Sequence, residues 1–412
     1  MDTQLSIRPG LNDHRVVESL LAPGGSGIFK SRRPVIGQLV ADATVAAARP
    51  ALADAAAAAG IPYLVDPLTP LLQGELAPND RWARLPFGQE EAVTPTDLQD
   101  SNARRDLIAR VVTFQMDLCA TAIIPPYTYA LSPSDPWFQL NLQLIRETAD
   151  YMIRSRVRLR VVPILAGQLQ HFGQPGRWAE GLGLFSRVAS STDPLFIGLC
   201  MSPAGAADES YGKVHRLFAL ALRLRAQGMR TVAWRQGIYG PGLVAAGLDG
   251  YETGIGVRER TDIAASVSRR KPRPPTRNDK PRTPQGLFVL PFGRSLSLPL
   301  ARQLLEDVRL RANIVCDDEQ CCPDGIKSMV ENYREHSVRS RARYLAELDD
   351  MPMPDWRLFK IGKDARESVG IIEQANRLLA RTPERTSLRT ESMSSLARVA
   401  DHMLEERMPR GA

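Results

Sequence analysis

Three cysteines and a histidine lie close together in the last third of the chain. Four residues separate Cys316 from the adjacent pair Cys321 and Cys322, and His336 follows fourteen positions after Cys322. Three thiolates and one imidazole are the ligand set of a closed, tetrahedral structural zinc site. Two other interpretations stay open, namely free buried thiols and a redox-active vicinal pair. We predict a structural zinc ion bound by these four residues.

A carboxylate follows a short apolar run in YLVDPLTPLLQ, where Asp66 precedes Pro67. At the end of a strand, this side chain suits a general base or a hydrogen-bond acceptor for a polar ligand. Aspartate is also among the best residues for capping the first turn of a helix. Asp66 is therefore a candidate site residue that has a structural alternative of equal weight.

Two more acids, Asp249 and Glu252, lie in the stretch LDGYETGIG. Because side chains alternate between the two faces of a strand, Asp249 shares a face with Tyr251 and Glu252 takes the other face. At most one of the acids can then point into a site, where neighbouring glycines let a ligand approach a nucleophile or base. In the structural alternative, Asp249 caps the turn and Glu252 pairs with Arg258 or Arg260.

Short apolar runs that alternate with helical stretches must position these residues. The runs expected to form strands are 27–31, 62–67, 121–127, 158–166, 194–202, 230–237, 249–256, 286–292 and 312–318. Strands without polar alternation, separated by segments of helical spacing, are typical of a parallel sheet that is buried on both faces. Eight or nine such units predict an α/β fold, a (β/α)8 TIM barrel, and not a doubly wound sheet.

In such a barrel, catalytic residues lie at the carboxyl-terminal ends of the strands. The polar residues expected there that are candidates for binding a substrate are Tyr127, Ser202, Arg235 and Gln236. No G-x-G-x-x-G motif follows the first expected strand, and no P-loop, G-x-S-x-G or H-E-x-x-H motif occurs. These absences disfavour nucleotide binding by glycine-rich loops, serine hydrolysis and zincin chemistry.

The net charge of +7 lies almost entirely in one segment. Residues 269–282 read RRKPRPPTRNDKPR, with seven basic side chains and one acidic side chain, inside a Pro-rich insertion that spans residues 257–285. The prolines disfavour a helix, so we expect either an extended loop that contacts the phosphates of a nucleic acid or a disordered segment. The basic residues are Arg269, Arg270, Lys271, Arg273, Arg277, Lys280 and Arg282.

The chain is expected to have two parts. Residues 1–318 form the barrel, and residues 319–412 form a zinc-associated turn and a C-terminal helical appendage. Helical spacing over residues 326–350, 364–381 and 392–408 predicts this appendage.

Cysteine usage and hydropathy indicate a compartment. Five cysteines are an odd number, which is poor material for a secreted disulfide framework, and the first residues lack the apolar core of a signal peptide. No run approaches the roughly 18 apolar residues of a membrane span. We therefore expect a cytoplasmic protein that does not bind a membrane.

Several of these motifs resemble those of the tRNA-guanine transglycosylases, which are TIM-barrel enzymes. The stretch RTVAWRQGIYGPGLVAAGLDGYETGIGVRER is similar to the strand, turn and helix that lead to the nucleophile of that family. YLVDPLTPLLQ stands in the place of its D-S-G-G-F-Q loop, and GLCMSPAGAADESY in the place of its G-G-L-A-V-G-E loop. The three cysteines and the histidine, with ARYLAEL after them, stand in the place of its zinc site, so the likeness spans about residues 60–345.

The resemblance implies a role for each matched residue. Glu252, or Asp249 if the register is offset, is the nucleophile, while Asp66 is the general acid/base and Gln73 matches a glutamine of the family. The implied reaction exchanges or cleaves a base at an N-glycosidic bond, so the implied partners are tRNA or DNA and a purine-like base. A homodimer is compatible with this function.

Two alternatives to this function stay open. The chain reads IIPPYTY where the family carries the acids that bind guanine, as expected of a catalytically inactive barrel that binds nucleic acid. The other alternative is an unrelated TIM-barrel enzyme that acts on a small substrate. Convergence of the carboxylates of Asp66 and Glu252, or Asp249, on one cavity would favour transglycosylase chemistry, and carboxylates on different faces would exclude it.

Overall fold

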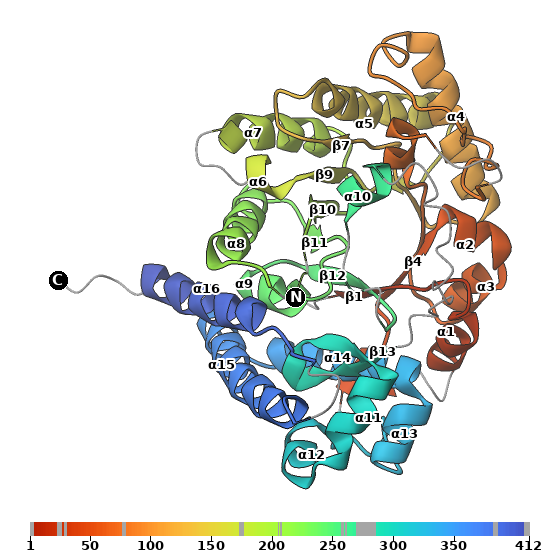
Figure 1. The fold of residues 1–412 in the computed structure, drawn as a ribbon. Helices are drawn as coiled ribbons and strands as arrows, with labels where there is room; N and C mark the ends of the chain where they lie inside the picture. Colours follow the sequence, from red (N-terminus) through yellow and green to blue (C-terminus); the bar gives the residue numbers. More distant parts are fainter. Residues whose placement is uncertain are drawn as a thin grey trace, which may run out of the picture.

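A curled, eight-stranded parallel sheet forms the centre of the computed structural model (Figure 1). The structure describes residues 4–22, 27–28, 31–75, 80–172, 177–204, 206, 208–256, 259, 262–268, 286–381 and 386–407. The strands follow the order β5-β4-β1-β12-β11-β10-β9-β7. Their bounds are β1 (Gln4–Arg8), β4 (Gln38–Asp42), β5 (Tyr63–Asp66), β7 (Tyr129–Ala130), β9 (Ile164–Gln168), β10 (Ile197–Ser202), β11 (Thr231–Ala233) and β12 (Gly250–Gly254).

A second parallel pair joins the two edges of this sheet. β6 (Ala122–Ile123) pairs with β8 (Arg160–Val161), and the amide of Thr121 donates a hydrogen bond to the carbonyl oxygen of Tyr63 in β5 at 2.8 Å. β6 is followed by β7 on one stretch of chain, and β8 by β9 on another. The ring therefore closes, and the predicted α/β fold of the TIM-barrel type is confirmed.

Helices surround the barrel on its outside (Figure 1). They are α1 (His14–Leu21), α2 (Ala43–Ala48), α3 (Ala51–Ala58), α4 (Ser101–Asp117), α5 (Pro136–Arg154), α6 (Leu169–Phe172), α7 (Arg177–Ser190), α8 (Tyr211–Arg225) and α9 (Gly240–Ala246). Two short elements lie at the carboxyl-terminal ends of the strands. These are the 3-10 turn η1 (Thr69–Gln73) and α10 (Ile263–Ser268), which pack against each other.

Alternate residues of each strand enter different apolar clusters. Leu39 and Ala41 belong to the cluster between the sheet and the helices, whereas Val40 packs with Leu64 inside the barrel. This alternation is the two-residue period of a strand, applied to a sheet that is buried on both faces. Any residue an even number of positions from Val40 on β4 therefore faces the barrel interior.

The C-terminal third packs on the outside of the barrel. It begins with the hairpin of β13 (Gly286–Val289) and β14 (Arg294–Ser297), joined by the turn η2 (Leu290–Phe292). The helices are α11 (Leu298–Glu306), α12 (Val308–Ile314), α13 (Ile326–Glu331), α14 (Tyr333–Asp349), α15 (Pro354–Leu379) and α16 (Glu391–Arg407). Here α14 contacts β1, α15 contacts α9 and α16 contacts α8. No helix within the described ranges is long and apolar enough to cross a membrane.

Some predicted strands lie elsewhere or do not form. β1 and β4 were not predicted, and the run 27–31 belongs to a small antiparallel pair, β2 (Gly27–Ile28) and β3 (Ser31–Pro34). The run 286–292 forms the first strand and the turn of a hairpin outside the barrel. The first residues of the run 312–318 belong to the last turn of α12. Periodicity alone cannot separate a short buried strand from a buried helical segment, which explains the last error. The division of the chain at residue 318 stays a prediction.

Candidate functional site

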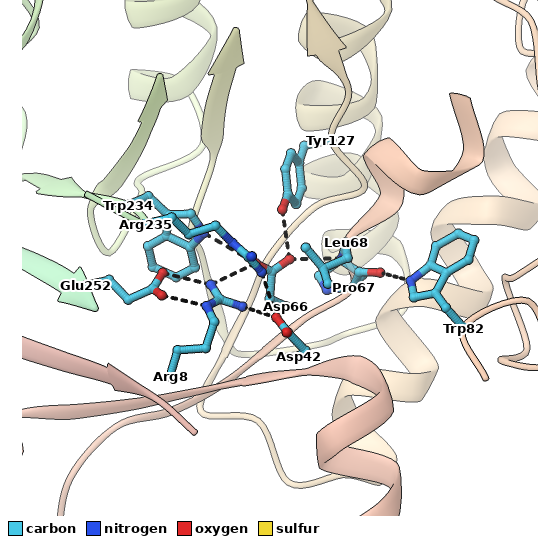
Figure 2. A network of polar contacts seen from close by, with 10 residues as sticks. All are labelled: Arg8, Asp42, Asp66, Pro67, Leu68, Trp82, Tyr127, Trp234, Arg235 and Glu252. Carbon is cyan, nitrogen blue, oxygen red and sulfur yellow. Dashed lines mark hydrogen bonds and ion pairs between the residues drawn. The ribbon is translucent and has the colours of Figure 1, made fainter. Parts of the chain in front are cut away.

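Charged side chains converge inside the barrel at the carboxyl-terminal ends of the strands (Figure 2). Asp42 lies beside Asp66 in the register of β4 and β5. Ser6 lies beside Glu252 in the register of β1 and β12, and Arg8 follows on the same face of β1. Because these positions share the inward face of neighbouring strands, four charged groups meet at one end of the barrel.

One guanidinium group binds three carboxylates from three other strands. Arg8 donates from Nε to Glu252 Oε1 at 2.5 Å and from Nη2 to Glu252 Oε2 at 2.7 Å. It also contacts Asp42 through Nη1, and its Nη2 lies 2.9 Å from Asp66 Oδ2. Burial by itself lowers the pKa of Arg8, but the charges of Glu252, Asp42 and Asp66 outweigh burial and raise that pKa well above its ordinary value. Arg8 is therefore a permanent cation at the centre of the site.

A second arginine approaches the same carboxylates from the loop after β11. The Nη2 of Arg235 lies 2.6 Å from Asp42 Oδ1 and 3.4 Å from Asp66 Oδ2. Burial and the charge of Arg8 lower the pKa of Arg235, and Asp42 and Asp66 reverse the effect and raise it. The backbone of Arg235 has a φ of 58°, in the left-handed region where residues other than glycine are strained. The fold therefore holds the side chain of Arg235 in the site in spite of a strained backbone conformation.

Asp66 is surrounded by hydrogen-bond donors. Its Oδ1 accepts from the amide of Leu68 at 2.9 Å and from the hydroxyl of Tyr127 at 3.0 Å. Its Oδ2 accepts from Nε1 of Trp234 at 3.3 Å, in addition to the two arginines. Burial, followed by the charge of Asp66, raises the pKa of Tyr127 well above its ordinary value, so its phenol stays a neutral donor. These contacts saturate the carboxylate.

Exposure divides the charged residues into two groups. The side chains of Asp66 and Glu252 are 0% and 1% exposed, and that of Arg8 is 8% exposed. Asp42 and Arg235 retain 19% and 15% exposure. Asp42 and Arg235 are therefore the two members of this network that a ligand at the barrel mouth reaches first.

Two predicted binding residues, Gln73 and Gln236, bind backbone groups instead of facing the charged network. Gln73 exchanges hydrogen bonds with Tyr129, from its Nε2 to the carbonyl oxygen at 2.8 Å and from the amide to its Oε1 at 2.6 Å. Gln236 donates from Nε2 to the carbonyl oxygen of Met201 at 2.6 Å. Both side chains fix loops that follow strands, and their role in binding a substrate stays a prediction.

Asp249 and Ser202 also make local contacts. Asp249 Oδ2 accepts from the amide of Thr231 at 2.7 Å, and its Oδ1 lies 3.7 Å from Arg225. Asp249 therefore lies at the start of β12, away from Glu252, as the alternation of the strand predicts. Ser202 Oγ accepts from the amide of Ile263 at 3.0 Å and ties α10 to the barrel mouth.

Two members of the network, Arg8 and Asp42, were missed from the sequence. The signal for Asp42 was present, since QLVAD ends in an acid after an apolar run as YLVD does at Asp66. Arg8 ends a strand whose inward residues are polar, so its run LSIR carries a weak hydrophobic signal. The seven basic residues of 269–282 lie outside the described residues, as do Arg258 and Arg260.

The predicted metal ligands converge in the C-terminal part. The ligand atoms of Cys316, Cys321, Cys322 and His336 all lie within 4.8 Å of one another. Cys321 Sγ and Cys322 Sγ are 3.8 Å apart, and they lie 3.3 Å and 3.4 Å from His336 Nδ1. The four residues therefore form a cluster that could bind a metal ion.

The tautomer of His336 suits such a cluster. Its Nε2 lies 2.9 Å from the carbonyl oxygen of Phe288. A carbonyl oxygen accepts only, so Nε2 carries the proton and the lone pair of Nδ1 faces the sulfur atoms. Metal-bound histidines are commonly oriented by a hydrogen bond of this kind.

Similarity to known proteins was found among solved structures alone. No family model and no curated protein matches the chain. One solved structure that it resembles is thiamine phosphate pyrophosphorylase from Pyrococcus furiosus, with 10% identity and a TM-score of 0.29 over 65% of this chain and 93% of that chain. A second is the carboxyl transferase domain from Rhizobium etli pyruvate carboxylase, with 10% identity and a TM-score of 0.32 over 98% of this chain and 61% of that chain. A third is a monomeric dihydrodipicolinate synthase variant, with 14% identity and a TM-score of 0.31 over 98% of this chain and 96% of that chain. At these values the similarity says nothing about substrate or reaction.

The predicted resemblance to the tRNA-guanine transglycosylases is wrong. The three solved structures named above are other barrel proteins, and no family model matches the chain. A strand, a glycine-containing turn and a helix recur in each unit of a barrel, so degenerate motifs of this kind match many α/β proteins. Base exchange in tRNA, with Glu252 or Asp249 as nucleophile and Asp66 as general acid/base, loses its basis with the resemblance.

Proposed function

We propose that this chain is a TIM-barrel enzyme that acts on a small, polar substrate at the carboxyl-terminal end of the barrel. The observation that supports this proposal is the difference in exposure within the charged network. Asp42 and Arg235 reach the mouth, while Arg8, Asp66 and Glu252 are buried beneath them. Active sites of TIM barrels occupy this end of the barrel. The proposal agrees with one alternative that the sequence left open, an unrelated TIM-barrel enzyme that acts on a small substrate.

In this proposal, Asp42 transfers a proton and Arg235 binds negative charge. A carboxylate within hydrogen-bond reach of a substrate proton is a general base, and a guanidinium group beside it stabilises the negative charge that develops when the proton leaves. Asp66 and Glu252 position the two arginines, because their side chains are buried beneath Asp42 and Arg235 and accept hydrogen bonds from donors of the chain itself. The substrate class that fits is a small carbon acid with an anionic group.

The geometry of α10 favours a small substrate over a polymer. Ile263 of α10 is buried in the same apolar cluster as Tyr127 and Trp234, which line the barrel interior at its mouth. This helix is attached through the hydrogen bond from its first amide to Ser202. A molecule that reaches Asp42 therefore has to share the mouth with α10.

Solvent exchange at carbon tests the proposal. The parent protein would be incubated in deuterium oxide with pyruvate, 2-oxobutyrate and dihydroxyacetone phosphate, and deuterium incorporation followed by proton NMR. We expect incorporation into at least one compound, reduced about 100-fold or more by Asp42→Asn. Asp106→Asn, which alters an exposed pair with Arg110 on α4, is the control and should keep the parent rate. Equal rates for parent and Asp42→Asn would exclude Asp42 as the base.

The Cys3His cluster supports a structural zinc ion. Tetrahedral zinc with Zn–S bonds of about 2.3 Å places sulfur atoms about 3.8 Å apart, and the Sγ atoms of Cys321 and Cys322 have this separation. Three sulfurs and one nitrogen fill all four positions, so a bound zinc ion would stabilise the fold and take no part in the reaction. The residues that would hold it are Cys316, Cys321, Cys322 and His336.

Metal analysis tests the identity of the ion. Purified parent protein should carry about one equivalent of zinc, and Cys322→Ser should carry much less. Cys119→Ser is the matched control, because Cys119 is an exposed free cysteine far from the cluster in sequence. A parent protein with fewer than about 0.3 equivalents of zinc would contradict the assignment.

A nucleic-acid partner is the second candidate, supported by charge. Six of the seven net positive charges lie in residues 269–282, which follow α10 directly in the sequence. Basic side chains that neutralise phosphates release counterions, so binding weakens steeply with salt. Fluorescence anisotropy with a labelled tRNA and a labelled DNA duplex should show binding that falls as salt rises and is lost when 269–282 is deleted. Binding that survives the deletion would exclude this segment as the contact.

A further inference from the structure

A cavity of about 500 Å³ lies outside the barrel, between β12, α9 and the C-terminal helices. Its volume is within the range of small-molecule sites, about 300–1,000 Å³. The apolar part of its wall is formed by Phe288, Leu290, Ile361, Ile371, Met393 and Leu396. It lies behind β12, whose opposite face carries Glu252 of the barrel network, so it is separate from the site proposed above.

Tyr251 contributes a buried polar atom without a partner to this cavity. The residue is 0% exposed, lines the cavity, and its hydroxyl has no hydrogen-bond partner among the described residues. Burial raises the pKa of Tyr251, so the phenol keeps its proton and can donate it. Gly240 allows this position, because a Cβ atom there would lie 2.1 Å from the ring. A buried hydroxyl without a partner is unfavourable and is rare in native proteins.

Arg343 contributes a second donor. Its Nη1 lies 2.7 Å from Asp317 Oδ1, whereas its Nε is buried and has no hydrogen-bond partner among the described residues. The nearest acid recorded for that atom is Glu347, whose Oε1 lies 3.6 Å away, which is beyond a hydrogen bond. Both Tyr251 and Arg343 therefore present an N–H or O–H group that lacks an acceptor.

The other charged groups of the wall already have partners. Lys360 Nζ lies 3.0 Å from Asp364 Oδ2, and the hydroxyl of Tyr344 donates to the same oxygen at 2.7 Å. Arg341 pairs with Glu259 and lies over the ring of Phe288. The acids of the wall are paired too, Asp317 with Arg343, Glu347 with Lys360 and Glu367 with Lys363. The hydroxyl of Tyr251 and Nε of Arg343 remain without an acceptor in the part of the chain that the structure describes.

We propose that this cavity binds a small organic carboxylate with an aromatic or branched apolar body. The carboxylate oxygens accept hydrogen bonds from the hydroxyl of Tyr251 and from Nε of Arg343, and the apolar body packs against the wall formed by Phe288 and the C-terminal helices. This site is a binding site in addition to the barrel mouth, and it does not depend on the function proposed there.

Three probes of one shape test the charge preference. The probes are 2-naphthoate, 2-naphthalenemethanol and 2-naphthylmethylammonium, and binding to the full chain would be measured by calorimetry and by saturation-transfer NMR. We expect 2-naphthoate to bind at least about tenfold more tightly than the alcohol and the ammonium compound, because the charge-assisted hydrogen bonds require an anion. Equal or tighter binding of the ammonium compound would overturn the proposal.

Two variants locate the probe. Tyr251→Phe removes one oxygen atom and should weaken 2-naphthoate binding about tenfold, and Arg343→Gln on the rim should weaken it by a similar factor. Tyr239→Phe is the matched control, since Tyr239 is also a fully buried tyrosine but does not line the cavity. If Tyr251→Phe and Arg343→Gln both bind 2-naphthoate as the parent does, the cavity is not the site. Asp42→Asn should leave this binding intact, which separates the result from the barrel-mouth proposal.

Discussion

The barrel-mouth network and the Cys3His cluster are both buried polar clusters, but they differ in how their charges are balanced. At the mouth, the carboxylates of Asp42, Asp66 and Glu252 meet the guanidinium groups of Arg8 and Arg235. The Cys3His cluster gathers three thiols and an imidazole around one point, and Arg343 is a cation of the chain that interacts with one of these thiols, Cys316. The network therefore balances its charges within the chain, whereas the cluster offers four groups that could bind a metal ion.

The two regions also differ in how far apart their members lie in the sequence. The cluster comes from residues 316–336, so a local motif reveals it. The network joins residues 8, 42, 66, 235 and 252, which become neighbours when the barrel closes. Spacing within a sequence therefore reveals a Cys/His cluster of this kind, but reveals a charged network inside a barrel only after the strands have been assigned correctly.

Removing Arg8 should have the largest effect on stability. Arg8→Met leaves the buried carboxylates of Glu252 and Asp66 without their shared cation, and breaking a buried ion pair in this way costs about 3–5 kcal/mol. Urea unfolding at neutral pH measures the loss. Arg110→Met is the control, because its exposed pair with Asp106 contributes at most about 0.5 kcal/mol. Similar losses for both variants would show that the network does not stabilise the mouth.

Removing the metal should be the next largest effect. An ion that binds the folded chain and is present at about 100 to 1,000 times its Kd contributes roughly 3–4 kcal/mol. Incubation with a strong chelator should lower the free energy of unfolding by that amount in the parent. It should have no effect in Cys322→Ser, which lacks a ligand already. A parent protein whose urea midpoint is unchanged by the chelator would mean that the cluster, like the network, needs no ion.

The barrel could be predicted from the sequence, but its first two strands were missed. The runs 62–67, 121–127, 194–202 and 249–256 stand out because they are apolar on both faces, as strands of a parallel sheet are. In β1, the polar residues Ser6 and Arg8 face the barrel interior and the apolar residue between them faces the helices. The inward face of a barrel strand is usually apolar, so β1 has the reverse arrangement. That inversion comes from the site itself.

Three of the five charged residues of the network followed from strand ends. Asp66, Arg235 and Glu252 were predicted because each lies at or just after a recognised strand, and the structure brings them together around Arg8. Asp42 could not be placed while β4 was unrecognised. The contact of Trp234 with Asp66 could not be predicted either, since no local pattern tells which aromatic residue of a barrel interior points toward a carboxylate.

Neutralising Glu252 should have a smaller effect than removing Arg8. Glu252→Gln keeps the shape of the side chain and one hydrogen-bond acceptor. The two hydrogen bonds from Arg8 lose their charge assistance, which should lower the free energy of unfolding by about 1–2 kcal/mol. In the double variant with Arg8→Met the two losses should not add, because both remove the same contact. Urea unfolding of the four proteins gives the coupling energy. Losses that add within about 0.5 kcal/mol would mean that Arg8 and Glu252 act independently.

The smallest expected effect concerns Cys200, the buried thiol inside the barrel. Burial raises the pKa of Cys200 from 9.0 to about 12. The folded chain therefore keeps this proton at a pH where the unfolded chain loses it, so this contribution to stability is present below about pH 9 and is lost as pH rises toward about 12.

Cys200→Ala should accordingly flatten the alkaline decline of stability, by at most about 1.4 kcal/mol per pH unit. Urea unfolding at about pH 8, 9 and 10 measures this slope, which is independent of the packing loss that the variant causes at every pH. Thiols of the cluster should behave in the opposite way, because they bind a metal as thiolates and gain affinity as pH rises. An unchanged slope of unfolding free energy against pH in Cys200→Ala would contradict the assignment of Cys200 as a thiol that burial keeps neutral. A flatter slope in Cys322→Ser would contradict the assignment of the cluster thiols as metal ligands.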